Sequence, residues 1–312
     1  MAKYPTFVSM IKKSGFIFFL LIQLNLAAQI VYENQDNVGI YEFLDEMANL
    51  RLIELNSAIK PYARNYIAGK LSEVRAIHLR GDYPLNKRQE LELQHYLNDY
   101  QQELPQGTGY RWSVDLIRPS SPTLQLAADP PGLHYRDSLF RLSLRPILGA
   151  TFLSNENGNG YQRWWGGELM GYIGKNAGFY VELRDNNASE PFAKPDYLTL
   201  QRGAVYKTRD DGSVDFSEMR GGITGSVKWG SIGILLDRFE WGDNLHGANI
   251  LGGKAPSVPY VSLRLNPVKW FDFSYFHGWL NSNIIDSSRS YVTDGEYRIV
   301  YRNKFTAANM FT

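Results

Sequence analysis

The chain has 312 residues, of which 44% are hydrophobic and 14% aromatic, enough for a substantial core or for one large sheet with an added domain. Its 33 basic and 32 acidic side chains nearly cancel, and the net charge of +1 gives no footprint for nucleic acid. The absence of cysteine excludes disulfide scaffolds, Cys-ligated metal sites and thiol catalysis. A mean hydropathy of −0.33, with one long apolar run at the start, excludes a protein of many membrane helices.

Residues 1–29 have the three-part pattern of a secretory signal peptide. Two lysines precede an apolar run at 16–22, and two alanines at 27–28 supply the small residues of a cleavage site. The alternative is a membrane anchor, but Gln23 ends the run short of the roughly 20 apolar residues that a spanning helix needs. We therefore expect cleavage, and a mature protein that works outside the cytoplasm.

The composition changes near residue 135. Of the 28 glycines, 7 lie in 1–138 and 21 in 139–312. Residues 31–135 carry 10 basic and 14 acidic side chains, whereas 136–312 carry 20 basic and 18 acidic ones. These differences predict two architectures in one chain.

The first part is predicted to be helical. Apolar residues recur at helical spacing in three segments of 30–105, and Pro61 opens the second of them. Asn86, with Gln89 three residues later, resembles a capping box at the start of the third. The sequence thus predicts a small three-helix domain at 30–105 and a linker at 106–138.

The second part, 139–312, alternates with the period of two that is typical of β-strands. From Phe140 to Phe152 the even positions are apolar, while the odd ones include Arg141, Ser143 and Arg145. Such alternation gives each strand one apolar and one polar face. Strands are predicted at 139–152, 161–174, 178–185, 218–229, 231–241, 258–266, 270–280 and 296–311.

Two structures could use this sheet: a soluble sandwich, with the apolar faces packed together, or a membrane barrel, with the apolar face toward lipid. Several segments reach the roughly 9 to 11 residues that cross a bilayer at a tilt. Tryptophans gather near segment ends, as in the aromatic girdles of barrels; they are Trp164, Trp165, Trp229, Trp241, Trp270 and Trp279.

The predicted connections favour the barrel, because outer-membrane barrels have short turns on the periplasmic side and long loops outside. The tight joins are 175–177, 230 and 267–269, and the long ones are 153–160, 186–217, 242–257 and 281–295. The sequence therefore predicts a mainly β protein: a transmembrane antiparallel β-barrel of about eight strands in the outer membrane. The N-terminal α-helical domain would lie in the periplasm.

The segment around Trp241 resembles the Wzi-type capsule assembly proteins, which are outer-membrane barrels. The residues that carry this likeness are Glu240, Trp241, Gly242, Gly247, Leu251 and Pro256. The stretches at 40–45 and 60–62 are similar to the helical domain of the versions found in gliding and capsule-bearing Bacteroidetes. The resemblance implies a surface protein that helps capsular polysaccharide attach to the cell, or a surface component of gliding motility. It also implies more strands than eight, and so a C-terminally truncated fragment with an incomplete barrel at 139–312.

The polar faces of the predicted strands carry more cations than anions. The cations are Arg141, Arg145, Arg184, Arg220, Lys228, Arg264, Arg298, Arg302 and Lys304, and the anions are Glu168, Glu182, Glu218, Asp237 and Asp272. Such a surplus could attract an acidic polysaccharide, because arginine pairs with carboxylates through two hydrogen bonds. The alternative is that these charges neutralise one another across neighbouring strands and fill the barrel.

The sequence offers no catalytic apparatus. Its five histidines have no metal-ligand spacing, and the glycine-rich stretch at 247–254 departs from a phosphate-binding loop. Asp210 and Asp211 form the one tight acidic pair in a long loop, and Asp followed by Gly is typical of a turn. We therefore expect a protein that is not an enzyme and needs no cofactor.

The leading hypothesis is a non-enzymatic outer-membrane barrel for attachment or assembly of surface polysaccharide. The alternatives are a component of gliding or secretion machinery and a porin-like diffusion channel. The expected partners are outer-membrane lipid and an acidic surface polysaccharide, without nucleic acid. Through its helical domain the chain would contact a periplasmic protein or peptidoglycan.

Overall fold

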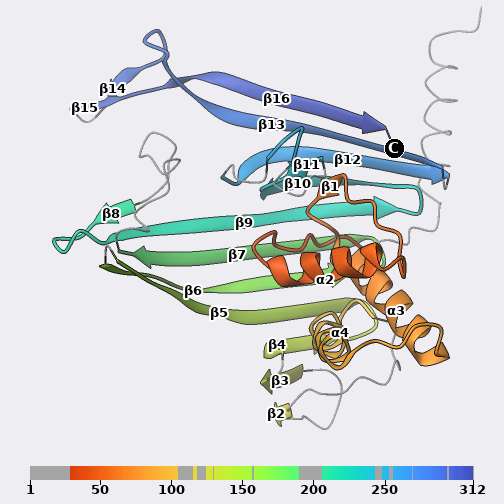
Figure 1. Ribbon diagram of the computed structural model, residues 1–312. Coiled ribbons are helices and arrows are strands. Elements are labelled where there is room, and N and C mark those ends of the chain that lie inside the picture. The colour runs from red at the N-terminus through yellow and green to blue at the C-terminus, as the bar shows by residue number, and fades with distance from the viewer. Residues whose placement is uncertain are drawn as a thin grey trace, which may run out of the picture.

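The computed structural model describes residues 29–104, 115–117, 124–128, 130–156, 158–189, 206–242, 248–252, 256–268, 270–293 and 295–311. Apart from Gln29, the predicted signal peptide lies outside these ranges. The described part consists of a small helical domain and a large antiparallel sheet (Figure 1). Within the described ranges, no helix combines the length and the apolar character needed to cross a membrane.

The helical domain contains α2 (Val38–Asn49), α3 (Arg64–Arg80) and α4 (Lys87–Asp99). The predicted capping box at the start of α4 is confirmed, because the Asn86 side chain accepts from the Gln89 backbone N–H and the Gln89 side chain accepts from the Asn86 N–H. At the C-terminal end of α3, Gly81 adopts a φ of 77°, which ends the helix in a left-handed turn. The apolar stripes of the three helices meet in one core around Leu44, Met47 and Leu71, all fully buried.

The sheet has twelve described strands. In chain order they are β2 (Asp115–Ile117), β3 (Leu124–Ala128), β4 (Pro131–Arg136), β5 (Phe140–Asn155), β6 (Gly158–Ile173), β7 (Ala177–Ala188), β8 (Tyr206–Thr208), β9 (Val214–Val227), β10 (Gly230–Asp237), β12 (Val258–Val268), β13 (Phe271–Ile285) and β16 (Tyr301–Phe311). Their spatial order is β16-β13-β12-β10-β9-β7-β6-β5-β4-β3-β2, with β8 beside β9, and every pair is antiparallel. The described strands form an open sheet that ends at β16 and β2, and no closure of a barrel is seen among them.

Several predicted boundaries change. Strands β2 to β4 lie inside the predicted linker 106–138. These short strands pair one with the next and extend the sheet beyond β5. The predicted long loop at 153–160 is instead the tip of a tight hairpin, since β5 and β6 stay paired as far as Asn155 and Gly158. Long and tight connections therefore do not alternate throughout.

The predicted strand at 296–311 is divided. Its first part, β15 (Glu296–Arg298), forms a small separate hairpin with β14 (Tyr291–Thr293), and only β16 joins the main sheet. The predicted strand at 231–241 is divided as well. After β10 the chain leaves the sheet, and β11 (Glu240–Trp241) pairs with β1 (Ile59–Lys60) of the helical domain.

The helices lie against the polar face of the sheet, in front of β4 to β9 in Figure 1. On this face Glu182, Arg220 and Thr224 are between 2 and 5% exposed. The apolar side chains of the sheet project from the opposite face, where Leu148 and Phe152 of β5 are 78% and 81% exposed and Ile234 of β10 is 71% exposed. The predicted division into two faces is thus confirmed, and the covered face is the polar one.

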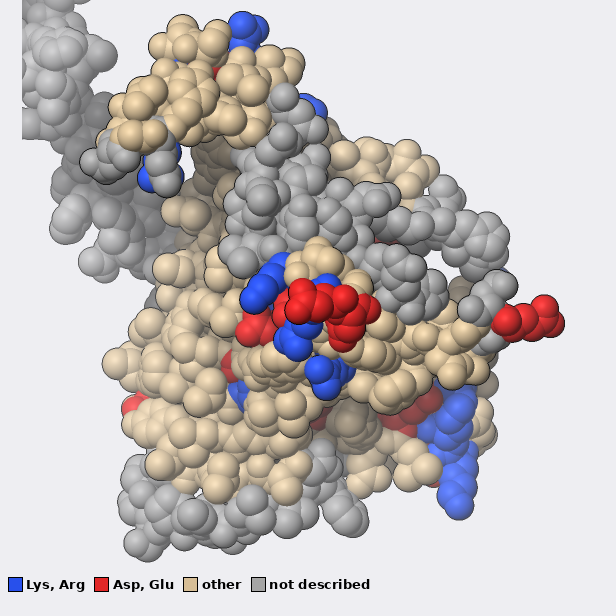
Figure 2. All heavy atoms as spheres, turned by 90° about the vertical axis from the view of Figure 1, so that its left-hand side faces the viewer, with Lys and Arg blue, Asp and Glu red and all other residues tan. Residues whose placement is uncertain are grey.

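Viewed from one end of the strands, a group of acidic and basic side chains lies near the middle of the view, and tan, uncharged residues make up most of the other described surface in sight (Figure 2). A second, smaller core lies on the inner face of the sheet. It contains hydroxyl-bearing rings such as Tyr172, Tyr180 and Tyr260, together with Trp241 and Phe276. Large aromatic rings with a polar edge suit this position, because they bury area and still hydrogen-bond to the charged groups beside them.

Candidate functional site

A row of charged side chains crosses the inner face of the sheet. Strand register places Arg145 beside Glu168, Glu168 beside Glu182, and Glu182 beside Arg220, on β5, β6, β7 and β9. Arg145 Nη2 lies 2.7 Å from Glu168 Oε2, and Arg220 Nη1 lies 3.2 Å from Glu182 Oε2. Arg220 Nε extends the row to Asp237 Oδ2 of β10, at 3.3 Å. The period of two puts all five side chains on one face of the sheet.

The helical domain presents its own buried ion cluster to this row. Arg64 of α3 is 1% exposed, and its guanidinium contacts Glu33 at 2.5 Å, Glu103 at 3.0 Å and Asp99 at 3.7 Å. Asp99 also pairs with Arg145 of the sheet. Asp99 therefore joins the helical ion cluster to the charged row of the sheet.

These contacts shift the pKa values of the helical groups. Burial by itself would lower the pKa of Arg64, but the negative charges of Glu103 and Glu33 outweigh it and raise that pKa well above its ordinary value. Burial would raise the pKa of Asp99, but the positive charges of Arg145 and Arg64 outweigh it and hold that pKa below its ordinary value. Both groups are thus kept charged although they are buried.

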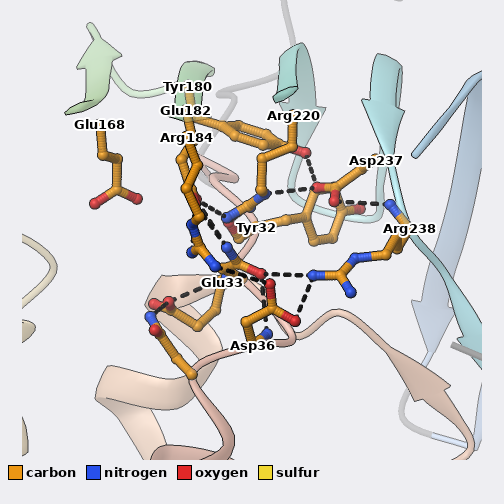
Figure 3. Close-up of polar contacts among 12 residues, drawn as sticks. Tyr32, Glu33, Asp36, Glu168, Tyr180, Glu182, Arg184, Arg220, Asp237 and Arg238 are labelled. Atoms are coloured by element: carbon orange, nitrogen blue, oxygen red, sulfur yellow. Dashed lines mark hydrogen bonds and ion pairs between the residues drawn. The ribbon is translucent and has the colours of Figure 1, made fainter. Parts of the chain in front are cut away.

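The segment that precedes α2 also lies on the inner face (Figure 3). The Asn34 Nδ2 group donates to both Glu182 carboxylate oxygens at 2.9 Å. Asp36 accepts from Arg184 at 3.2 Å and pairs with Arg238 at 2.5 Å. Close approach of this segment depends on Gly178 of β7, where a Cβ atom would lie 2.1 Å from the Ile30 carbonyl oxygen.

We call this set the inner charge cluster. Its basic members are Arg64, Arg145, Arg184, Arg220 and Arg238, and its acidic members are Glu33, Asp36, Asp99, Glu103, Glu168, Glu182 and Asp237. Acidic members outnumber basic ones, because the helical domain contributes four carboxylates and a single arginine. The cation surplus counted on the strands alone is therefore absent at this interface.

The structure separates the cations predicted on the polar faces of the strands into two groups. Arg145, Arg184 and Arg220 belong to the inner charge cluster, and Arg141 donates to the Gln102 carbonyl of the helical domain. The others lie outside it. Arg264 pairs with Asp272 at 3.1 Å, whereas Lys228, Arg298, Arg302 and Lys304 are exposed, with Arg298 on the separate β14–β15 hairpin.

The segment around Trp241, which carries the resemblance to Wzi-type proteins, folds against the helical domain. Glu240 pairs with Lys60 at 3.8 Å, and Trp241, 4% exposed, packs edge-on against Phe276. The N–H of Gly242, whose φ is 102°, donates to the Ala58 carbonyl. Two backbone hydrogen bonds of 2.9 Å join Trp241 and Leu251. Pro256 is half-buried ahead of β12, and Gly247 lies outside the described residues.

The tryptophans predicted to form a girdle differ in exposure. Trp165, Trp229, Trp270 and Trp279 are between 41 and 79% exposed. Trp241 is buried under the helical domain, where β11 pairs with β1, so its place in a girdle is a wrong prediction. Trp164 lies on the inner face, since a Cβ atom at Gly149 would lie 2.3 Å from its ring.

Sequence reasoning missed the helical members of the inner charge cluster, Arg64 and Asp99 above all. The acidic excess of residues 31–135 was the available signal, because it complements the basic excess of the strands. Charge counts do not say which groups meet, so the pairing could not be found in this way.

The inner charge cluster is suited to holding two parts of the chain together. Its arginines are paired with carboxylates, and in the described ranges no three His, Asp or Glu side chains are placed to hold a metal ion. Comparison with known proteins finds no matching family model, no matching curated protein and no matching solved structure.

Replacing Arg64 should destabilise the docked helical domain. Arg64→Met leaves Glu33 and Glu103 as buried, unpaired carboxylates, and we expect a loss of about 3 to 5 kcal/mol in the free energy of unfolding. The control is Arg80→Met on the same helix, whose pair with Asp82 is exposed, with an expected loss of at most about 1 kcal/mol. Denaturant unfolding of the full chain in detergent measures both. Equal effects of the two substitutions would contradict a buried cluster.

The depressed pKa of Asp99 predicts sensitivity to acid. A carboxylate with a folded pKa below its unfolded value of 3.8 stabilises the fold above that pH, and the stabilisation is lost as pH falls through the folded pKa. We expect the stability of the native chain to fall more steeply below about pH 4 than that of Asp99→Asn, which has no proton to bind. Unfolding curves measured at several pH values from about 6 to about 3 test this prediction. Parallel pH profiles would contradict the role of Asp99.

Proposed function

We propose that the chain is an outer-membrane protein whose sheet forms part of a β-barrel, with its apolar face in lipid and its helical domain filling the interior. One observation carries this proposal: the helices cover the polar face of the sheet, and the apolar face is left exposed. In a soluble protein of helices on a sheet, the helices bury the apolar face. Here the order is reversed, as expected where the outside is hydrocarbon and the inside is polar.

Strand length and aromatic placement support lipid over a second protein layer. Strands β5, β6 and β13 have 15 or 16 residues, well beyond the usual five or six of globular strands. Exposed apolar faces of this extent are rare in soluble monomers. The exposed Trp165 and Trp279 pair in register with the exposed Leu148 and Phe305, so both indole rings lie on the apolar face of the sheet.

For the biological role we propose attachment or assembly of capsular or surface polysaccharide, without catalysis. This rests on the resemblance of the Trp241 segment to Wzi-type proteins and on the filled interior. A diffusion channel needs a water-filled path, but Arg145, Arg184 and Arg220 are already paired with carboxylates on the inner face. The packing therefore favours an anchor over an open pore.

Lipid contact can be measured with spin labels, since the chain has no cysteine of its own. Leu148→Cys and Ile234→Cys place a label on the apolar face, and Asp210→Cys places one in an exposed turn as the control. In vesicles we expect collisions with oxygen to exceed those with a water-soluble nickel complex at 148 and 234, and the reverse at 210. Greater nickel access at 148 and 234, or low access of both reagents there, would contradict lipid contact.

Deletion of the gene in its native host tests the biological role. We expect loss of cell-associated capsule with unchanged motility, because an anchor for polysaccharide has no part in movement. Staining of capsule on washed cells and the spreading rate of colonies measure the two effects, and re-expression of the intact chain is the control. Normal capsule with lost motility would overturn this role in favour of gliding or secretion machinery.

A further inference from the structure

A pocket of about 710 Å³ lies where two tight turns of the sheet meet a loop of the helical domain. The β9–β10 turn contributes Lys228 and Trp229, the β12–β13 turn contributes Asn266 and Trp270, and the helical domain contributes Asn56. These turns lie at the right-hand end of the strands in Figure 1. The volume is within the range of small-ligand sites.

The lining combines apolar planes with hydrogen-bonding groups. The Trp229 and Trp270 rings are 41% and 79% exposed, so both offer ring surface to a ligand. Asn56 and Asn266 bring carboxamides, which both donate and accept. A sugar ring has an apolar face and a rim of hydroxyl groups, and this combination matches its chemistry.

The pocket is partly held in shape before any ligand binds. The Asn266 backbone N–H donates to the Trp229 carbonyl at 2.8 Å, which joins the two turns. The Asn56 backbone N–H donates to the Tyr66 hydroxyl at 3.2 Å, which fixes the helical loop. A site fixed in this way loses less entropy on binding.

The charges favour an acidic ligand with few negative groups. Asp272 lines the pocket, but its carboxylate is held by Arg264 at 3.1 Å. Lys228 is exposed, and within the described ranges no ion-pair partner of its ammonium is found. The Lys228 ammonium suits a carboxylate on a sugar.

We propose that this pocket binds a short segment of a glycan that bears a carboxylate. The two indole rings stack on sugar faces, the asparagines hydrogen-bond to hydroxyl groups, and Lys228 pairs with the acid group. The pocket is defined by the two turns and the helical loop, so its binding activity does not rest on the proposed function. If the sheet does span the outer membrane as proposed, the tight turns lie at its periplasmic end.

Calorimetric titration of the full chain in detergent tests the proposal, with trigalacturonic acid as the acidic probe and maltotriose as the neutral one. We expect the native chain to bind the acidic sugar more tightly. Trp270→Ala should weaken binding of both sugars at least about tenfold, as loss of a central aromatic anchor does. Lys228→Gln should remove the preference for the acidic sugar and leave binding of maltotriose unchanged.

Two control variants match these changes. Lys175→Gln removes an exposed lysine from the β6–β7 turn, and Trp165→Ala removes an exposed indole from the outer face of β6; neither residue lines the pocket. Both should bind as the native chain does. The proposal is overturned if the native chain binds neither sugar, or if Trp165→Ala weakens binding as much as Trp270→Ala. Tighter binding of glycerophosphoglycerol that is lost in Trp270→Ala would overturn it in favour of a lipid headgroup.

Discussion

The fold depends on the burial of charge between the helical domain and one face of the sheet. A buried arginine such as Arg64 is tolerated only where several acceptors surround it, and Glu33, Asp99 and Glu103 supply them. The row from Arg145 to Asp237 imposes the same condition on the sheet. The helical side has a surplus of carboxylates and the sheet side a surplus of arginine, so groups of opposite charge meet where the two parts contact.

Buried ion pairs of this kind add little to net stability, but breaking one is costly. Bringing ions out of water offsets much of their mutual attraction, whereas removing one partner leaves the other buried and unpaired. Misplacing the helical domain would therefore carry a high free-energy cost. The helices have their own apolar core around Leu44 and Leu71, so their contact with the sheet can be polar without loss of a folded domain.

The exposed apolar face and the covered polar face of the sheet connect the inner charge cluster with the proposed membrane location. If hydrocarbon covers the apolar face, the polar face needs either water or protein, and the helical domain provides protein over β4 to β9. The Trp241 segment takes part in this filling, because β11 leaves the sheet to pair with β1. Part of this segment thus contacts the helical domain.

The sequence by itself determined the three helices, the long strands of the sheet and the two faces of those strands. Alternation from Phe140 to Phe152 predicted β5, and the Asn86 and Gln89 pair predicted the start of α4, because both patterns depend on neighbours a few residues apart. Only the tertiary structure decided that the helices lie on the polar face and that Arg145 meets Asp99, 46 residues earlier in the chain. It also decided that β2 to β4 extend the sheet and that Trp241 is buried. The physical reason is that charge pairing and edge pairing depend on which groups approach in space, and no local periodicity encodes that approach.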